Sequence, residues 1–141
     1  FYGKLIDYDE KDLNTEKSQY LGVIENEKIS SVIAKYDFLV FPTFHEGEGY
    51  PGVILESYSV GVPVITTFFR SIPEIVDDKI NGFLIPIEDH NALADVINNL
   101  QKYDYKKLSK NAEQKFMQFD CKIIYDLYLS KIKSLSKCAE L

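Results

Sequence analysis

Cysteine is scarce in this sequence, and tryptophan is absent from it. The 141 residues include two cysteines, Cys121 and Cys138, and they do not form a CxxC pair. Such spacing argues against a zinc site or a disulfide framework. The low cysteine content favours a reducing cytoplasm over an exported location. None of the familiar metal-binding motifs appears either, so no metal and no cofactor are expected.

The sequence also lacks a long apolar run and an excess of positive charge. No stretch approaches the roughly 20 apolar residues that cross a bilayer, and no signal peptide opens the chain. The formal net charge is -6. That charge argues against a nucleic-acid partner and against a purely electrostatic attachment to an anionic membrane. We expect a cytoplasmic protein, and peripheral attachment at the inner face of the plasma membrane stays open for the full-length protein.

What is present suits one globular domain of ordinary composition, with 45% hydrophobic and 27% charged residues. A domain of this length buries a real core without disulfides or metals. The chain opens on the apolar run FYGKLI, without a methionine. We therefore expect a piece of a larger protein that is truncated on its N-terminal side.

Short apolar segments alternate with segments of helical periodicity, which predicts an α/β domain with a doubly wound, Rossmann-like parallel sheet. Strands are predicted at Phe1–Ile6, Gln19–Ile24, Asp37–Phe41, Val64–Thr67 and Gly82–Ile85. Helices are predicted at Glu27–Tyr36, Pro51–Val60, as a short turn at Pro73–Val76, and from Asp89 onward, with Asp120 capping the last helix. The core then occupies residues 1–100. The helical part, residues 101–138, packs outside the sheet or on a neighbouring domain.

The loop after Phe41 is the main candidate for chemistry, because ligands bind beyond the carboxyl ends of parallel strands. It is rich in glycine, which lets a backbone approach a ligand closely. The helix that follows offers free N–H groups to an anion. Glu48 lies in the loop and Glu56 about a turn and a half into the helix. Two ionised carboxylates in one cleft suit the paired hydroxyl groups of a sugar or a ribose.

Simpler interpretations of the same residues stay open. A glutamate near a helix N-terminus often only complements the helix dipole, and Glu56 fits a solvated helix surface equally well. The glycine-rich loop matches neither the dinucleotide nor the Walker fingerprint. His45 beside the loop is more typical of a structural residue than of a catalytic one, and His90 of a capping or surface residue.

The segment EGYPGVILE, from Glu48 to Glu56, resembles the signature of glycosyltransferase family 4, in which seven residues separate two glutamates. The following SVGVPVITT and the stretch from Ile72 to Leu100 are similar to the rest of that family's donor domain. This resemblance implies the C-terminal domain of a GT-B fold and a retaining transfer of a hexose from a nucleotide-diphospho-sugar.

The resemblance also implies roles by position. Glu56 would contact the donor ribose, and Glu48 would contact the transferred sugar, orienting it and stabilising charge rather than attacking it. Backbone groups around Gly49 and Tyr50 would lie near the sugar and diphosphate, and the donor-binding loop is completed by Pro51 and Gly52. No metal is implied.

Two departures from the family pattern carry information. Where many members have a Gly-Gly pair, this chain reads FFRSIPEIV, which resembles transferases of bacterial capsular and exopolysaccharide synthesis. Arg70 in that stretch would reach the donor phosphates; a surface pairing with an acidic neighbour is the alternative. The family's early Arg and Lys, which neutralise the diphosphate, have no counterpart in these residues.

The sequence therefore predicts a glycosyltransferase of cell-surface polysaccharide synthesis, with a carbohydrate or lipid-linked acceptor bound by a missing N-terminal domain. A GT-B-fold sugar-nucleotide epimerase or hydrolase, and a non-catalytic nucleotide-sugar-binding module, are the alternatives. Residues 1–141 alone are expected to bind donor weakly and to transfer nothing. Loss of a central strand would leave unpaired edges that favour self-association.

Overall fold

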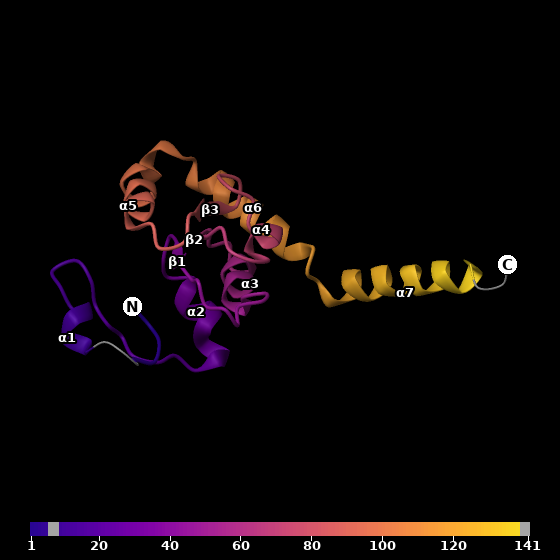
Figure 1. The fold of residues 1–141 in the computed structure, drawn as a ribbon, viewed down its shortest axis with the longest axis horizontal. Coiled ribbons are helices and arrows are strands. Elements are labelled where there is room, and N and C mark those ends of the chain that lie inside the picture. The colour runs from indigo at the N-terminus through magenta and orange to yellow at the C-terminus, as the bar shows by residue number, and fades with distance from the viewer. Residues whose placement is uncertain (6–8, 139–141) are drawn as a thin grey trace.

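The protein is built around a small parallel sheet, as Figure 1 shows for the computed structural model, which describes residues 1–5 and 9–138. The strands are β1 (Leu39–Phe41), β2 (Val64–Thr67) and β3 (Gly82–Ile85), in the spatial order β1-β2-β3. Both pairings are parallel. The three strands occur where the sequence predicts them, with β1 beginning at Leu39 rather than at Asp37. Short apolar strands between helices are typical of a sheet that is covered on both faces.

The helices follow the predicted order with small shifts at their ends. Their bounds are α1 (Glu10–Leu13), η1 (Asn26–Lys28), α2 (Ile29–Ile33), α3 (Gly52–Ser59), α4 (Ile72–Ile75), α5 (His90–Asn99), η2 (Leu100–Lys102), α6 (Tyr105–Met117) and α7 (Cys121–Cys138). Side chains of aspartate begin the three long C-terminal helices, because a carboxylate at this position accepts otherwise unpaired backbone N–H groups. Asp89 accepts from Ala92 N at 2.9 Å, so Asp89 and not His90 caps α5. Asp120 caps α7 as predicted, accepting from Lys122 N at 2.8 Å.

Helices cover both faces of the sheet, as a doubly wound fold requires. Consecutive residues of β2 point in opposite directions. Val64 joins a cluster with Ile54 and Tyr58 of α3, whereas Ile65 joins a cluster with Phe83 that α5 and the start of α6 cover. All four residues of β2 are buried, which makes it the central strand of the described sheet. This two-sided burial explains why the sequence of β2 is continuously apolar or β-branched.

Gly82 begins β3 at a point of close backbone approach. A Cβ atom at this position would lie 2.6 Å from the Val64 carbonyl oxygen. The neighbouring strand cannot retreat without losing its pairing, because Val64 is opposite Gly82 in the β2–β3 register. Glycine is therefore required here by space, which agrees with its role where two backbones meet closely.

A buried polar network ties α3, the turn before β3 and α6 together. The Tyr58 hydroxyl donates to Asn81 Oδ1 at 2.8 Å, and Asn81 Nδ2 donates to Asp77 Oδ2 at 3.0 Å. Lys115 of α6 reaches the same carboxylate oxygen at 3.0 Å. Tyr58 and Asn81 are almost completely buried, and their hydrogen-bonding groups are satisfied within the network. Burial, together with the nearby Asp77 charge, raises the pKa of Tyr58 far above its ordinary value.

The two predicted N-terminal strands are absent from the described residues. Residues 1–5 and Gln19–Ile24 form no regular strand, and Ile6 lies outside the described residues. The two segments do lie side by side, because Gly3 N donates to the Gly22 carbonyl at 2.9 Å. Both glycines have positive φ angles, +136° and +83°. Such backbone interrupts an extended strand, so the strand predictions were wrong even though the pairing of the two segments is present.

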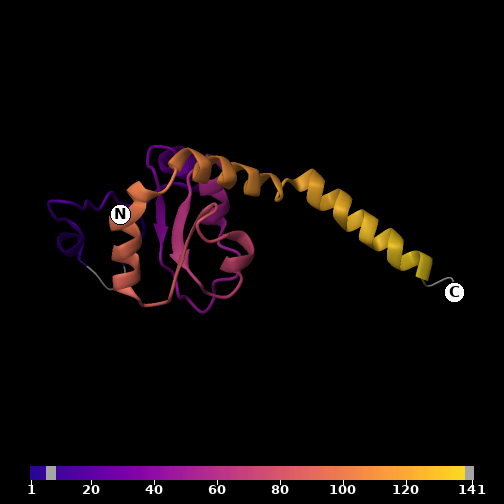
Figure 2. The ribbon, with the colours of Figure 1, turned by 90° about the horizontal axis from the view of Figure 1, so that it is seen from above.

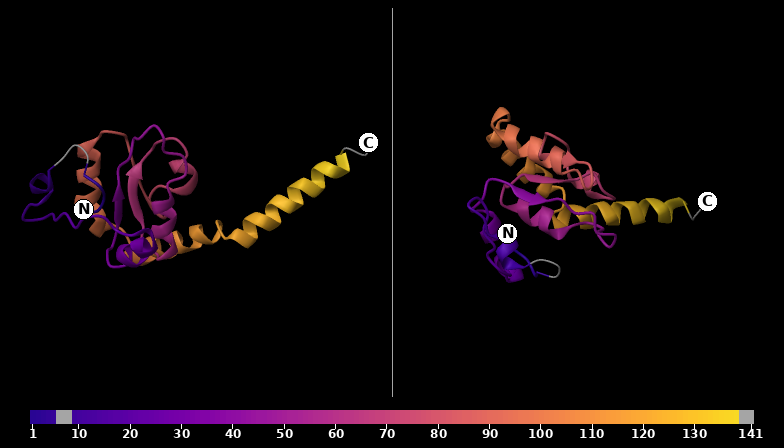
Figure 3. Two further views of the ribbon diagram at one scale, coloured as in Figure 1. Left: turned by 90° about the horizontal axis from the view of Figure 1, so that it is seen from below. Right: turned by 60° about the vertical axis from the view of Figure 1, so that its left-hand side comes forward.

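The C-terminal third divides into a packed and an unpacked part. Leu108 and Ala112 of α6 are buried against the sheet clusters, which confirms the predicted packing outside the sheet. In contrast, α7 extends away from the body of the molecule in each view (Figures 2 and 3). Its exposed large apolar residues are Ile123, Ile124, Tyr125, Leu127, Tyr128, Ile132 and Leu135. In the part of the chain that the structure describes, no helix has the length and apolarity needed to cross a bilayer.

Candidate functional site

The loops that follow β1 and β2 meet at the carboxyl edge of the sheet, where the sequence predicts the site. Thr66 Oγ1 donates to the Phe41 carbonyl at 2.7 Å, and Thr67 Oγ1 donates to the Thr43 carbonyl. Further along, Ser71 Oγ donates to the Gly49 carbonyl. Hydroxyl groups from the end of β2 and from the loop after it thus hold the backbone of the loop that follows β1. The signature segment is fixed to the end of β2 rather than free in solvent.

Glu48 is partly buried inside this junction. Thr43 Oγ1 donates to Glu48 Oε2 at 3.2 Å. The Glu48 backbone N–H donates to the His45 carbonyl at 2.9 Å, which closes a tight turn. The exposed His45 ring lies over Gly47, with Nε2 2.9 Å from the place where a Cβ would stand. Thus His45 contributes to the shape of the turn through its backbone and ring.

Glu56 lies in the middle of α3 and is partly buried. Its carboxylate has no hydrogen-bond or ion-pair partner among the residues that the structure describes, whereas its backbone carbonyl accepts from Ser59 Oγ at 2.7 Å. A partly buried carboxylate without a protein partner is available to an external donor group. Whether Glu48 and Glu56 face one common cleft stays a prediction.

Tyr50 links the signature loop to two other parts of the chain. Its hydroxyl donates to Glu74 Oε2 of α4 at 2.6 Å, and its ring meets Phe119 edge-on, with centroids 6.3 Å apart. The hydrogen bond to Glu74, together with desolvation, raises the pKa of Tyr50 above its ordinary value. Tyr50 therefore stays a neutral hydrogen-bond donor across the physiological range.

Glu74, Phe119, Thr43 and Ser71 are contacts that the sequence prediction missed. Glu74 and Ser71 carried a signal, because both stand in FFRSIPEIV, a segment on which the family resemblance partly rests. The sequence did not indicate which residues of the signature loop they contact, nor did it indicate the contacts made by Thr43 and Phe119. Periodicity and motif spacing do not detect pairings of this kind.

The N-terminus of α3 has the open backbone groups expected of an anion site. Pro51 is buried and precedes the helix, and Gly52 is its first residue. Within the described part of the chain, the backbone N–H groups of Gly49, Tyr50 and Gly52 have no backbone or side-chain acceptor. Unpaired N–H groups at a helix N-terminus, aided by the helix dipole, favour a bound anion.

Arg70 has a strained backbone beside this region. Its φ angle is +47°, which is uncommon for a residue other than glycine. The side chain is exposed, and its guanidinium lies 5.4 Å from the centroid of the adjacent Phe69 ring. Among the described residues no acidic group forms an ion pair with it, so the alternative of a surface salt bridge finds no support there. Its role toward a phosphate stays a prediction.

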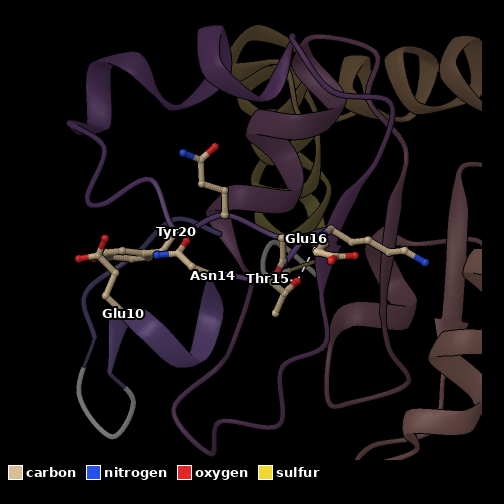
Figure 4. Close-up of a pocket in the computed structure, with 8 residues that line it drawn as sticks. Glu10, Asn14, Thr15, Glu16 and Tyr20 are labelled. Atoms are coloured by element: carbon tan, nitrogen blue, oxygen red, sulfur yellow. Dashed lines mark hydrogen bonds between the residues drawn. The ribbon is translucent and has the colours of Figure 1, made fainter.

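Two cavities of the structure lie away from this junction. One of about 590 Å³ sits in the N-terminal segment, lined by Glu10 and residues 14–20. Figure 4 shows its labelled side chains, which come from α1 and from the segment that follows this helix. A second, of about 440 Å³, lies between the turn before β3 and the start of α6. Neither is lined by Glu48 or Glu56. In the described ranges, no three His, Cys, Asp or Glu side chains gather in a way that would hold a metal ion.

Comparisons with known proteins identify the family of this chain. Residues 3–102 match the family described as glycosyl transferases group 1. The O-antigen chain mannosyltransferase B of Escherichia coli is 34% identical over 92 residues, which are 64% of this chain and 23% of that protein. The amylovoran biosynthesis glycosyltransferase AmsK of Erwinia amylovora is 30% identical over 86 residues, 58% of this chain and 21% of the relative. The chain thus spans less than a quarter of these relatives.

Solved structures of glycosyltransferases also resemble this chain. HepE of Anabaena in complex with UDP-glucose superimposes with a TM-score of 0.68 at 26% identity, covering 84% of this chain and 33% of that one. The C-terminal domain of LpcC, a glycosyl transferase group 1 family protein of Francisella tularensis, has a TM-score of 0.57 at 25% identity, over 72% of this chain and 54% of the other. These likenesses confirm the predicted GT-B-type α/β fold. Since the family match covers residues 3–102, well over half of the chain, the protein belongs to the glycosyl transferases group 1 family.

Proposed function

We propose that this chain is the donor-binding part of a retaining glycosyltransferase of family 4, which transfers a hexose from a nucleotide-diphospho-sugar during assembly of a cell-surface polysaccharide. The observation that carries the proposal is the junction at the carboxyl edge of the sheet. There the partly buried Glu48, the unpartnered Glu56 and the open N–H groups before α3 come from one segment that β2 holds in place.

Each part of the site has a role in this proposal. Open N–H groups at Gly49, Tyr50 and Gly52 bind the donor diphosphate, with Arg70 as an added cation. Glu56 accepts hydrogen bonds from the ribose hydroxyls, and Glu48 from the transferred sugar. The proposed site neutralises the diphosphate with N–H groups and cations of the protein.

Retention is part of the proposal rather than of the family assignment. The acceptor hydroxyl attacks the anomeric carbon on the same face that the nucleotide leaves, and a donor phosphate oxygen takes the acceptor proton. Glu48 orients the sugar and stabilises the charge that develops on it. The acceptor, a carbohydrate or a lipid-linked sugar, binds outside residues 1–141 in this account. Relatives named for O-antigen and amylovoran synthesis support the link to surface polysaccharide.

Calorimetric titration of the full-length protein with UDP-glucose, GDP-mannose and ADP-glucose tests donor binding, and a transfer assay with NMR detection of the product's anomeric configuration tests retention. Glu56→Ala should weaken donor binding by about 1–3 kcal/mol, because a hydrogen bond to a bound polar group is lost. Glu48→Ala should lower turnover more than affinity. Glu113→Ala serves as the matched control, because this exposed glutamate of α6 lies beside Gly61, at the end of α3 opposite the junction. Wild-type turnover in Glu48→Ala would refute the assignment of Glu48, and a product of inverted configuration would refute retention.

A further inference from the structure

Thr43 connects the end of β2 to the Glu48 carboxylate through its backbone carbonyl and its side-chain hydroxyl. Its backbone carbonyl accepts from Thr67 Oγ1, so the end of the buried strand β2 fixes its main chain. Its own hydroxyl donates to Glu48 Oε2 at 3.2 Å. A chain of two threonines therefore runs from the sheet core to the carboxylate.

The two hydrogen bonds of the Thr43 hydroxyl determine where its proton points. Its oxygen accepts from the His45 backbone N–H at 3.3 Å, the local bond by which a threonine stabilises a turn. The single hydroxyl proton is then directed to Glu48, since an ionised carboxylate only accepts. The same hydroxyl thus shapes the turn that carries Glu48 and holds one oxygen of its side chain.

We propose that Thr43 is a positioning residue, which holds the Glu48 carboxylate in the orientation that the transferred sugar requires. This inference rests on the proposed function, because it takes Glu48 to act on the donor sugar. The physical reason is that a carboxylate on a flexible side chain contributes to a reaction only when its geometry is fixed before the sugar arrives. Oε2 is fixed by Thr43, and Oε1 remains for the sugar.

Two substitutions separate the hydroxyl from the shape of the side chain. Thr43→Val keeps the branched shape and removes the hydroxyl, whereas Thr43→Ser keeps the hydroxyl and loses a methyl group. In the full-length enzyme, with UDP-glucose and GDP-mannose as probes, Thr43→Val should lower kcat about tenfold with little change in KM, the size expected for one hydrogen bond to a charged group. Thr43→Ser should recover kcat to within about threefold of the wild type.

A double-mutant cycle distinguishes positioning from a general structural effect. In a Glu48→Ala background, Thr43→Val should cost less than about twofold in kcat, because the group that it positions is already gone. Thr66→Val is the matched control. It removes a threonine hydroxyl from the same strand end, but among the described residues that hydroxyl bonds to the Phe41 carbonyl and not to Glu48. Its effect should be the same in both backgrounds.

The outcomes separate the failure of this inference from the failure of the proposed function. If Glu48→Ala lowers kcat but Thr43→Val costs the same with and without Glu48, the positioning role is overturned and the proposed function stands. If Glu48→Ala leaves kcat unchanged, the positioning role of Thr43 and the role of Glu48 in the proposed function are both overturned. A crystal structure of Thr43→Val gives a readout without activity. We expect Glu48 in a different rotamer, and an unmoved carboxylate would overturn the inference.

Discussion

The central strand β2 and the C-terminal helix α7 both carry apolar side chains but place them in opposite surroundings. Val64 and Ile65 of β2 have no exposed surface, whereas Leu127 and Tyr128 of α7 are 69% and 70% exposed. Helices cover β2 on both faces, and α7 leaves the body of the molecule (Figure 1). An apolar pattern therefore shows which face of an element is suited to burial, but it does not show which other element covers that face. The stability of the described chain should depend on the first region and hardly on the second.

The largest effect should follow truncation of the core beside β2. Ile54→Ala removes a fully buried side chain of α3 that packs in the cluster of Val64. It should lower the free energy of unfolding by about 2–5 kcal/mol, because the lost contacts leave a cavity. Urea denaturation followed by circular dichroism measures the change. A loss below about 1 kcal/mol would mean that the cluster is not the source of stability.

A somewhat smaller loss of stability is expected at Gly82, where β2 and β3 approach each other closely. Gly82→Ala places a methyl group 2.6 Å from the Val64 carbonyl oxygen, closer than atoms can approach. The strand must shift, and overpacking of this kind costs about 1–3 kcal/mol. Thermal unfolding is the measurement, with Gly49→Ala as control because a Cβ there meets nothing within 4 Å. Equal melting temperatures for Gly82→Ala and the wild type would contradict the strand register.

The hydrogen-bond network around Tyr58 predicts that the stability of the protein depends on pH. The pKa of Tyr58 is raised in the folded state, so the folded protein keeps its proton where the unfolded chain, with an ordinary value of 10.0, loses it. Stability should therefore be intact below about pH 10 and fall as pH rises above it, because the unfolded state then binds fewer protons. Tyr58→Phe should flatten this alkaline slope and cost about 1–2 kcal/mol at neutral pH, since Asn81 loses its donor. Tyr128→Phe, on the exposed α7, should leave the slope unchanged.

The smallest effect should be found on α7 itself. Leu127→Ala should change the free energy of unfolding by less than about 0.5 kcal/mol, because the side chain loses no buried contact with the described residues. Urea denaturation of residues 1–141 beside the Ile54→Ala variant gives the comparison directly. A loss of several kcal/mol would show that α7 is covered in solution, for example by a second copy of the chain.

The sequence was a good guide wherever burial decides the structure. Val64–Thr67 and Gly82–Ile85 have the predicted bounds, because flanking prolines, glycines and continuous apolar residues mark a covered strand. The prediction failed at residues 1–5 and Gln19–Ile24, where apolar side chains stay largely exposed and positive-φ glycines interrupt the backbone. A composition typical of strands does not form a regular strand when local backbone geometry opposes it.

The site shows the same division. The motif located the loop, and the structure brings that loop to the expected edge of the sheet. The hydroxyl contacts that fix it were not predictable, since Thr43, Thr67 and Ser71 are ordinary residues whose partners are set by tertiary structure. The roles of Glu48, Glu56 and Arg70 toward a donor stay predictions that the proposed titrations test.

The network around Asp77 has a consequence for how the chain unfolds. Its hydrogen bonds join Tyr58 to Asn81 across 23 residues and Asp77 to Lys115 across 38. The side chains of α3 and α6 both bond to the pair formed by the buried Asn81 and the partly exposed Asp77. Releasing either helix thus leaves a polar group of this pair without its partner. The two helices and the sheet should therefore open as a single cooperative unit in native-state hydrogen exchange, while α7, outside the network, exchanges its amides long before them.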